Sequence, residues 1–359
     1  MKRPPSFVLV RRILLLMGAW LCLAGPPTFA ESVPSASTTA KQEYEQGQKL
    51  LKDGRYPEAV AALKKAIESN PRLAEAHHAL GMAYFTGQKR PVEAIDEITK
   101  AIELNPTAPQ FYYDLALIHQ TQDRTAEAEQ ALKQAIRISP RFEEAHFALA
   151  KLYERSRAAD KAVQAYRELL AVRPGHQGAL YGLGYLYDGQ GQAAQAREVL
   201  EQLTKADQRH ADGWYLLGRI AEKESRLTDA AGLYRLAIAA KPDLVDAHYN
   251  LGFIYRSEGK QTEAAREFKE VIRLKPEYAE AHLNLGGVYT ELGKLDDAEK
   301  EYETALTLKP NLVEAHYSMG IFYELHKKDT AKALARYRKY LELGGKDERV
   351  ERIVGEVKK

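Results

Sequence analysis

The chain has 359 residues, of which 45% are hydrophobic and 28% are charged, and its formal net charge is +2. This balance excludes the strongly basic surface of a nucleic-acid-binding protein. A single cysteine, Cys22, excludes a disulfide framework within the chain.

Residues 1–30 have the pattern of a secretory signal. Basic residues are followed by an apolar run over residues 13–24, and Thr28 and Ala30 stand where a signal peptidase requires small residues. The run is too short to span a bilayer comfortably. We therefore expect export to the periplasm with cleavage after Ala30, and an uncleaved N-terminal membrane anchor is the alternative. Residues 31–39 are small and polar, which predicts a flexible leader.

Beyond this leader, proline recurs about every 34 residues. The spacing is interrupted only once, at Gln208, where the next proline would stand. A period of this length indicates one supersecondary unit that is stacked many times, without a single globular core. The prolines are Pro71, Pro106, Pro140, Pro174, Pro242, Pro276 and Pro310.

Each unit is predicted to be a pair of antiparallel helices, which we call helix A and helix B. In residues 279–312, apolar residues follow helical spacing on both sides of Gly293, which suits a left-handed turn, and Pro310 ends the second helix. The eighth position of every unit is glycine or alanine, and one position of helix B is alanine in all nine units, from Ala59 to Ala333. Small residues of this kind indicate close packing where the two helices cross.

This pattern resembles the tetratricopeptide repeat, and the resemblance covers nearly all of the chain after residue 39. It implies an all-α protein, a right-handed α-solenoid superhelix of antiparallel helix pairs. Repeats two and nine each require one extra residue between their helices. Residues 347–359 have one apolar stripe and are predicted to be a capping helix on repeat nine. The predicted repeats are 40–73, 74–108, 109–142, 143–176, 177–210, 211–244, 245–278, 279–312 and 313–346.

The sequence contains no constellation of catalytic residues. No Gly-rich phosphate loop follows a strand, and no serine, cysteine or lysine stands in a nucleophile motif. Five histidines recur at the fourth position of helix A, but a full helix pair separates successive members, which is too far for a shared metal ion. We interpret them as packing residues and expect no enzyme activity, cofactor or metal. The five are His77, His146, His248, His282 and His316.

In tetratricopeptide arrays, helix A lines a concave face on which peptides commonly bind. Here the fifth position of helix A is mostly aromatic, and repeats five to seven add further aromatic, arginine and asparagine residues to the same face. Tyrosine and arginine are enriched at binding hot spots. The predicted partner-binding residues are Tyr113, Phe147, Tyr181, Tyr185, Tyr215, Arg219, Tyr249, Asn250, Phe253, Arg256 and Tyr317.

Two interpretations of this aromatic face stay open, because the repeat's generic sequence also prefers tyrosine at the fifth position. If the face binds partners, the protein is predicted to be a non-catalytic exported scaffold that binds protein or peptide partners and helps to assemble a cell-envelope complex. The alternative is a carbohydrate-binding periplasmic protein of a polysaccharide export or modification system, with Asp188 and Glu222 bonding to the sugar. Neither interpretation involves nucleic acid, and the only expected membrane contact is an uncleaved signal segment.

Repeat five departs most from the pattern. Gln208 replaces the terminal proline, and Gly178 and Gly182 lie within its first helix. Glycine inside a helix costs about 1 kcal/mol relative to alanine. We therefore hypothesise a flexible joint between the two halves of the array.

Overall fold

The computed structural model describes residues 36–356, and every regular element in this range is helical. Eighteen α-helices form nine antiparallel hairpins, and a last helix, α19 (Glu348–Glu356), follows them. The A helices are α1 (Ala36–Lys52), α3 (Ala74–Gln88), α5 (Pro109–Thr121), α7 (Glu143–Arg155), α9 (Gln177–Gly189), α11 (Ala211–Lys223), α13 (Val245–Ser257), α15 (Ala279–Glu291) and α17 (Val313–Phe322). The B helices are α2 (Tyr56–Ser69), α4 (Pro91–Leu104), α6 (Thr125–Ile138), α8 (Ala159–Val172), α10 (Ala193–Ala206), α12 (Leu227–Ala240), α14 (Gln261–Leu274), α16 (Leu295–Leu308) and α18 (Thr330–Glu342).

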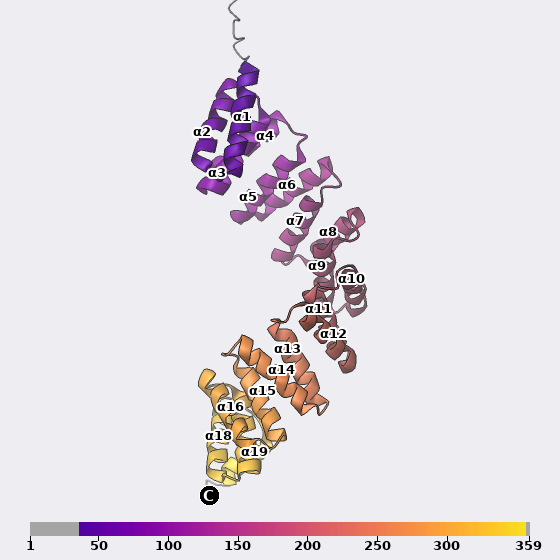
Figure 1. Cartoon of the computed structure of the whole chain (residues 1–359), viewed down its shortest axis with the longest axis vertical. Coiled ribbons are helices and arrows are strands. Elements are labelled where there is room, and N and C mark those ends of the chain that lie inside the picture. Colours follow the sequence, from indigo (N-terminus) through magenta and orange to yellow (C-terminus); the bar gives the residue numbers. More distant parts are fainter. Residues whose placement is uncertain (1–35, 357–359) are drawn as a thin grey trace, which may run out of the picture.

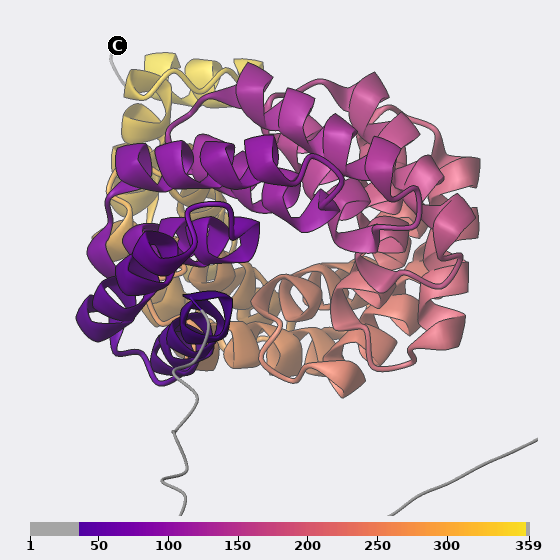
Figure 2. The ribbon, with the colours of Figure 1, turned by 90° about the horizontal axis from the view of Figure 1, so that it is seen from above.

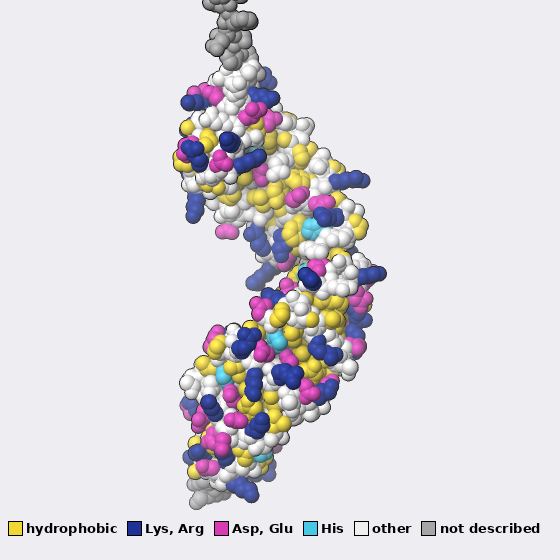
Figure 3. All heavy atoms as spheres, in the orientation of Figure 1, with side chains coloured by type: hydrophobic (Ala, Val, Ile, Leu, Met, Phe, Trp, Pro, Cys, Tyr) yellow, Lys and Arg dark blue, Asp and Glu magenta, His cyan; other side chains and the backbone are white. Residues whose placement is uncertain are grey.

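The hairpins stack into an elongated, curved array (Figure 1), whose outline with all side chains is seen in Figure 3, and seen along its long axis the array turns through a ring (Figure 2). This arrangement confirms the predicted α-solenoid of antiparallel helix pairs. At several junctions, among them α9 with α11 and α13 with α15, consecutive A helices contact each other directly, and no two described B helices do so to a comparable extent. Because the inner side of a curved array is the shorter one, the A helices line its concave face.

The A helices of repeats two to nine begin at the residues where those repeats are predicted to begin. The first helix differs, since α1 begins at Ala36 rather than Ala40. The prediction of a flexible leader is therefore wrong for residues 36–39. No proline or glycine interrupts the chain between Ala36 and Gln46, so the helical pattern extends toward the N-terminus.

The predicted signal segment and the rest of the leader lie outside the described residues. Within residues 36–356, no helix has the length and apolar character needed to cross a membrane.

The extra residues of repeats two and nine are both accommodated at the end of helix A. Helix α3 has 15 residues, whereas the A helices of repeats three to eight have 13. In repeat nine, α17 continues as a π-helix, η1 (Tyr323–Lys327), whose wider turn takes up the insertion. Both extended helices end in a left-handed residue, Lys89 and Lys328, which reverses the chain.

The small residues at the eighth position make room for large side chains of helix B. A Cβ atom at Gly320 would lie 2.5 Å from the ring of Tyr337, and one at Gly218 would lie 2.6 Å from the ring of Tyr234. Both rings are completely buried. At these two positions the predicted close approach is therefore between the backbone of helix A and a side chain of helix B, whereas at Gly81 the backbone oxygen of Ala94 also comes close.

The histidines at the fourth position pack between repeats and also form hydrogen bonds that the sequence analysis did not foresee. In each, Nε2 donates to the carbonyl oxygen of the proline six residues earlier, at 2.9–3.1 Å. Tyr112 and Trp214 donate in the same way to the carbonyls of Pro106 and Gln208. Each of these bonds satisfies a carbonyl group just beyond the end of the preceding B helix.

These histidines differ at their second nitrogen. Nδ1 of His282 lies 2.6 Å from Glu301, and His77 and His248 have equivalent glutamates. The Nδ1 atoms of His146 and His316 are buried without a partner. Accordingly, the hydrogen bond with Glu301 raises the pKa of His282, whereas burial lowers the pKa of His316.

We expect Glu301→Gln to destabilise the protein more at acidic than at basic pH. Because the pKa of His282 is raised, the folded chain binds more protons than the unfolded chain. This stabilisation is complete below the ordinary histidine pKa of about 6.5 and is lost as the pH rises through the raised pKa. In urea denaturation, the loss should be about 1–2 kcal/mol near pH 5.5 and smaller near pH 8.5.

Glu303→Gln is the matched control, because Glu303 lies on the same helix and its side chain is exposed and unpaired. Its effect should be small and equal at both pH values. An equal loss at both pH values for Glu301→Gln would contradict the assigned role of this hydrogen bond.

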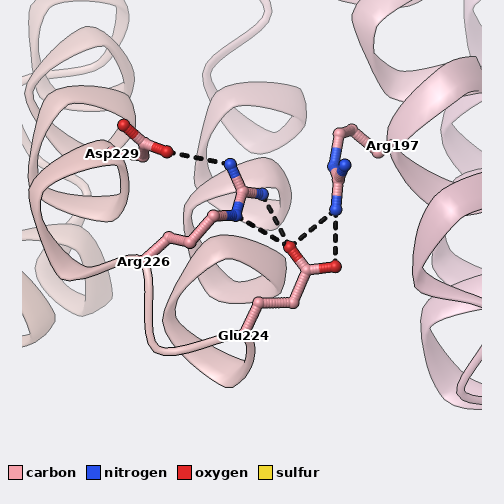
Figure 4. Close-up of polar contacts among 4 residues, drawn as sticks. All are labelled: Arg197, Glu224, Arg226 and Asp229. Carbon is pink, nitrogen blue, oxygen red and sulfur yellow. Dashed lines mark hydrogen bonds and ion pairs between the residues drawn. The ribbon is translucent and has the colours of Figure 1, made fainter.

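The junction between repeats five and six is held by an ionic network (Figure 4). Arg197 of α10 reaches Glu224 at 2.5–2.6 Å, and Arg226 binds both Glu224 and Asp229 at 2.7–3.0 Å. Hydrogen bonding to Arg226 lowers the pKa of Glu224. The network links the start of helix B of repeat five to the turn between the two helices of repeat six.

The glycines of repeat five also have a packing reason. A Cβ at Gly182 would lie 2.5 Å from the Tyr166 ring, and one at Gly178 would lie 3.0 Å from Phe147. Both rings belong to repeat four, so these glycines let the two repeats approach each other. Together with the bond from Trp214 to the Gln208 carbonyl, these contacts argue against a loose joint at this place.

The last helix packs on the end of the array. Val350 is completely buried and Val354 is 7% exposed, in one apolar cluster with Leu334 and Tyr337 of α18. Arg349 adds an ion pair with Glu324 at 2.5 Å. The predicted apolar stripe thus faces repeat nine over the described part of the segment, while Val357 lies outside the described residues.

Candidate partner-binding groove

The fifth-position aromatic residues lie between successive repeats and are half-buried. The ring of Tyr249 stacks on Tyr278, with 5.2 Å between centroids, and Phe147 packs on His176 at 5.0 Å. Tyr113 and Tyr181 make the equivalent contacts with Phe142 and His210. Each of these four partners immediately precedes the next A helix. Each partner is the last residue of the ring's own repeat, so the rings pack against the connection that leads into the next repeat, which agrees with the packing interpretation.

Tyr215 and Tyr317 are half-buried in the same way. Tyr215 packs on Tyr234 of its own repeat, with ring centroids 5.7 Å apart, and Tyr317 packs on Tyr340 at 5.1 Å. Only part of each ring remains on the groove surface.

Two aromatic residues of the groove are much more exposed. Tyr185 on α9 and Phe253 on α13 are 51% and 52% exposed. Both stand one helical turn beyond the fifth position, and Arg219 occupies the same position on the intervening α11. These two rings provide the largest free aromatic surface on the A helices of the described chain.

The polar residues predicted for the groove are engaged in bonds between helices. Lys223 approaches the buried carboxylate of Asp188 at 2.6 Å, and Arg219 lies 3.7 Å from it. Asn250 donates to the hydroxyl of Tyr234 at 3.1 Å, and that hydroxyl donates to Glu222 at 2.5 Å. Asp188 and Glu222, the carboxylates suggested for sugar binding, thus already have partners, which disfavours the carbohydrate alternative.

A hollow of about 320 Å³ opens between α13, α15 and α17. On one side, Arg256 binds Glu291 at 2.7 and 3.0 Å and Asn284 at 3.4 Å. Its guanidinium group lies over Gly287, where a Cβ would come within 2.8 Å of Nη2. Arg256 is therefore held in place rather than free. The hollow is lined by Tyr249, Arg256, Glu280, Leu283, Asn284, Gly287, Tyr302, Leu312, Glu314 and Ser318.

The hollow was not predicted from the sequence. The feature of the sequence that could have indicated it is Gly287, since the same position is occupied by Phe253 in the preceding repeat and by Ile321 in the next one. The absence of a side chain at that position leaves the space that Arg256 enters.

A carboxylate occupies the second position of helix A in six of the nine repeats, and we call this set the acidic row. Burial raises the pKa of Tyr181, and the nearby charge of Asp212 raises it further. Asp246 has the same effect on the pKa of Tyr215, after burial. Asp212 and Asp246 therefore each lie close to the fifth-position tyrosine of the preceding repeat. The acidic row consists of Glu75, Glu144, Asp212, Asp246, Glu280 and Glu314.

The acidic row was not predicted from the sequence either, because an acidic residue in the first turn of a helix is ordinary support for the helix dipole. The feature of the sequence that could have indicated the row is the recurrence of Asp or Glu at one inward-facing position of helix A. Within the described chain, no group of three or more His, Cys, Asp or Glu residues is arranged to hold a metal ion.

The chain matches sequence profiles described as "Tetratricopeptide repeat" over residues 44–109, 85–152, 143–176 and 181–245. A profile described as "TPR repeat" matches residues 253–292 and 286–326. Together with the stacked hairpins, these matches show that the chain belongs to the tetratricopeptide repeat family, whose solenoids are typically protein-interaction scaffolds without catalytic activity.

Several solved structures are similar to this chain. The C-terminal part of a repeat protein from Cytophaga hutchinsonii has a TM-score of 0.60 and 16% identity, covering 67% of this chain and 99% of that one. YrrB, described as a repeat protein with an unusual peptide-binding site, has a TM-score of 0.48 and 21% identity, over 53% and 98% of the two chains. MamA has a TM-score of 0.43 and 27% identity, over 45% and 95%. No curated protein matches the chain.

Proposed function

We propose that this protein is an exported, non-catalytic scaffold that binds protein partners in the groove formed by its A helices. The observation that carries this proposal is the exposure of Tyr185 and Phe253, whose rings are about half free on the concave side. Exposed aromatic residues of this size are typical of binding hot spots, because they bury a large area when a partner covers them.

The signal-like N-terminal segment supports export, and export places the scaffold in the cell envelope. There, it would hold the components of an assembling complex together. Fractionation of cells and N-terminal sequencing of the recovered protein test this part. Recovery from the cytoplasm with residues 1–30 intact would contradict it.

The groove is tested with the double variant Tyr185→Ala/Phe253→Ala. We expect it to reduce co-purification of the envelope partners at least tenfold while the circular dichroism spectrum stays unchanged, since each truncated hot spot costs about 2 kcal/mol or more of binding free energy. The measurement is quantitative mass spectrometry of proteins cross-linked to the chain in the producing cells.

Leu236→Ala is the matched control. Leu236 is 46% exposed, but it lies on α12, a B helix. Its replacement should leave partner recovery unchanged. Equal recovery with the double variant and the parent would contradict the groove as the binding site, and selective retention of a glycan instead of proteins would favour the carbohydrate alternative.

A further inference from the structure

We infer that the groove selects an extended, basic segment of its partner, in which lysine or arginine side chains contact successive tyrosine–carboxylate pairs. This inference rests on the proposed function and adds the chemistry of the bound segment. Three consecutive pairs, which we call the central pairs, carry the argument. They are Tyr181 with Asp212, Tyr215 with Asp246, and Tyr249 with Glu280.

The two members of each pair come from adjacent repeats. At the third pair, Asn284 of α15 donates to the Tyr249 hydroxyl at 3.0 Å and also to the backbone carbonyl of Glu280 at 2.8 Å. Asn284 thereby fixes the end of the tyrosine ring beside the first turn of α15, which carries Glu280. The phenol ring thus stands beside the first turn of the next A helix, whose second-position carboxylate, Glu280, is itself ion-paired with Lys309.

The free charge of this part of the groove is negative. Five of the six carboxylates of the acidic row, Asp212 and Asp246 among them, are exposed and have no ion-pair partner among the described residues, whereas Glu280 is paired with Lys309. The cations of the same face are only partly free, since Arg256 binds Glu291, and Lys223 and Arg219 share Asp188, which leaves one positive charge. Charge complementarity therefore favours a basic partner and opposes an acidic one.

The aromatic rings suit the same ligand groups. The stem of lysine or arginine packs on an aromatic face, and its charged end is attracted to the ring and to a neighbouring carboxylate. Tyr185 and Phe253 flank the central pairs and provide apolar contacts for the residues between the basic ones.

The spacing of the repeats predicts the spacing of the basic residues. At several junctions, consecutive A helices contact each other directly, in contrast to the full helix pair expected between them from the sequence, and helices in contact are about 8–10 Å apart. An extended polypeptide rises about 3.3 Å per residue. A basic residue at about every third position would therefore reach one pair after another.

The test uses a fluorescent 12-residue peptide with lysine at every third position among serine and glutamine, and a second peptide with glutamate in place of lysine. Binding to the full chain is measured by fluorescence anisotropy. We expect the lysine peptide alone to bind, and its affinity to fall at least tenfold in the triple variant Asp212→Asn/Asp246→Asn/Glu280→Gln. Salt should weaken binding to the parent strongly, because the carboxylates are near the surface.

The matched control is Glu198→Gln/Glu263→Gln/Glu303→Gln, which removes the same number of charges from exposed positions on B helices. It should bind the lysine peptide like the parent. Equal losses in both triple variants would show non-specific charge attraction and overturn the inference, as would binding of the glutamate peptide. If partner recovery depends on Tyr185 and Phe253 but not on the central carboxylates, the proposed groove stands and only its basic specificity is wrong.

Discussion

Replacement of Tyr166 by alanine should lower the free energy of unfolding by about 3–5 kcal/mol. The Tyr166 side chain is completely buried, and its ring lies against Gly182 of the next repeat. Its hydroxyl donates to Glu154 at 2.6 Å. The substitution would leave a cavity between repeats four and five and would also remove this hydrogen bond. Urea denaturation followed by circular dichroism measures the loss.

A repeat array is stabilised by contacts between neighbours, so this loss should also weaken the coupling of the two halves. We expect hydrogen exchange in α7 to α10 to accelerate more than in the terminal repeats. Tyr166→Phe is the control, since it keeps the ring and removes only the hydroxyl, at a cost of about 1 kcal/mol. Equal effects of the two substitutions would mean that the ring itself contributes little.

Replacement of Val350 by aspartate should detach the last helix. Val350 is completely buried against repeat nine, and a carboxylate there would have to lose its hydration or pull the helix into solvent. Because α19 can undock without unfolding the array, the cost is limited to its docking free energy, about 2–3 kcal/mol. Undocking would expose the apolar side of α18.

The expected results are a lower melting temperature and faster aggregation on heating, measured by calorimetry and light scattering. Glu351→Gln is the control, because Glu351 is exposed on the same helix. It should behave like the parent. Unchanged melting and solubility for Val350→Asp would show that the end of the array needs no cap.

The features that recur with the period of the chain could be predicted from the sequence. Helix pairs, their starting residues and the small crossing positions all follow from spacing, because each repeat must bury the same face. The start of α1 could not be predicted, since no neighbouring repeat sets its length. The hydrogen bonds of His282 were missed because spacing locates a residue on a helix but does not show which carbonyl its ring reaches.

The groove was predicted only in part, for a physical reason. Spacing assigns Tyr185 and Tyr249 to the same face. The exposed fraction of each ring, however, depends on whether the residue that precedes the next A helix packs against it. Tyr278 covers part of Tyr249, whereas Tyr185 remains half free. Likewise, the sequence shows Arg256 and Asp188 as charges, and only the structure shows that each is already paired.

Each tyrosine–carboxylate pair is divided between two repeats, so the curvature of the solenoid sets the distance within every pair. A pull that straightens the array would separate Tyr215 from Asp246, and a tighter coil would bring them together. A segment bound across several pairs would then oppose any change in the curvature of the solenoid. Stretching the protein would weaken its hold on the partner, and the bound partner would make the protein stiffer.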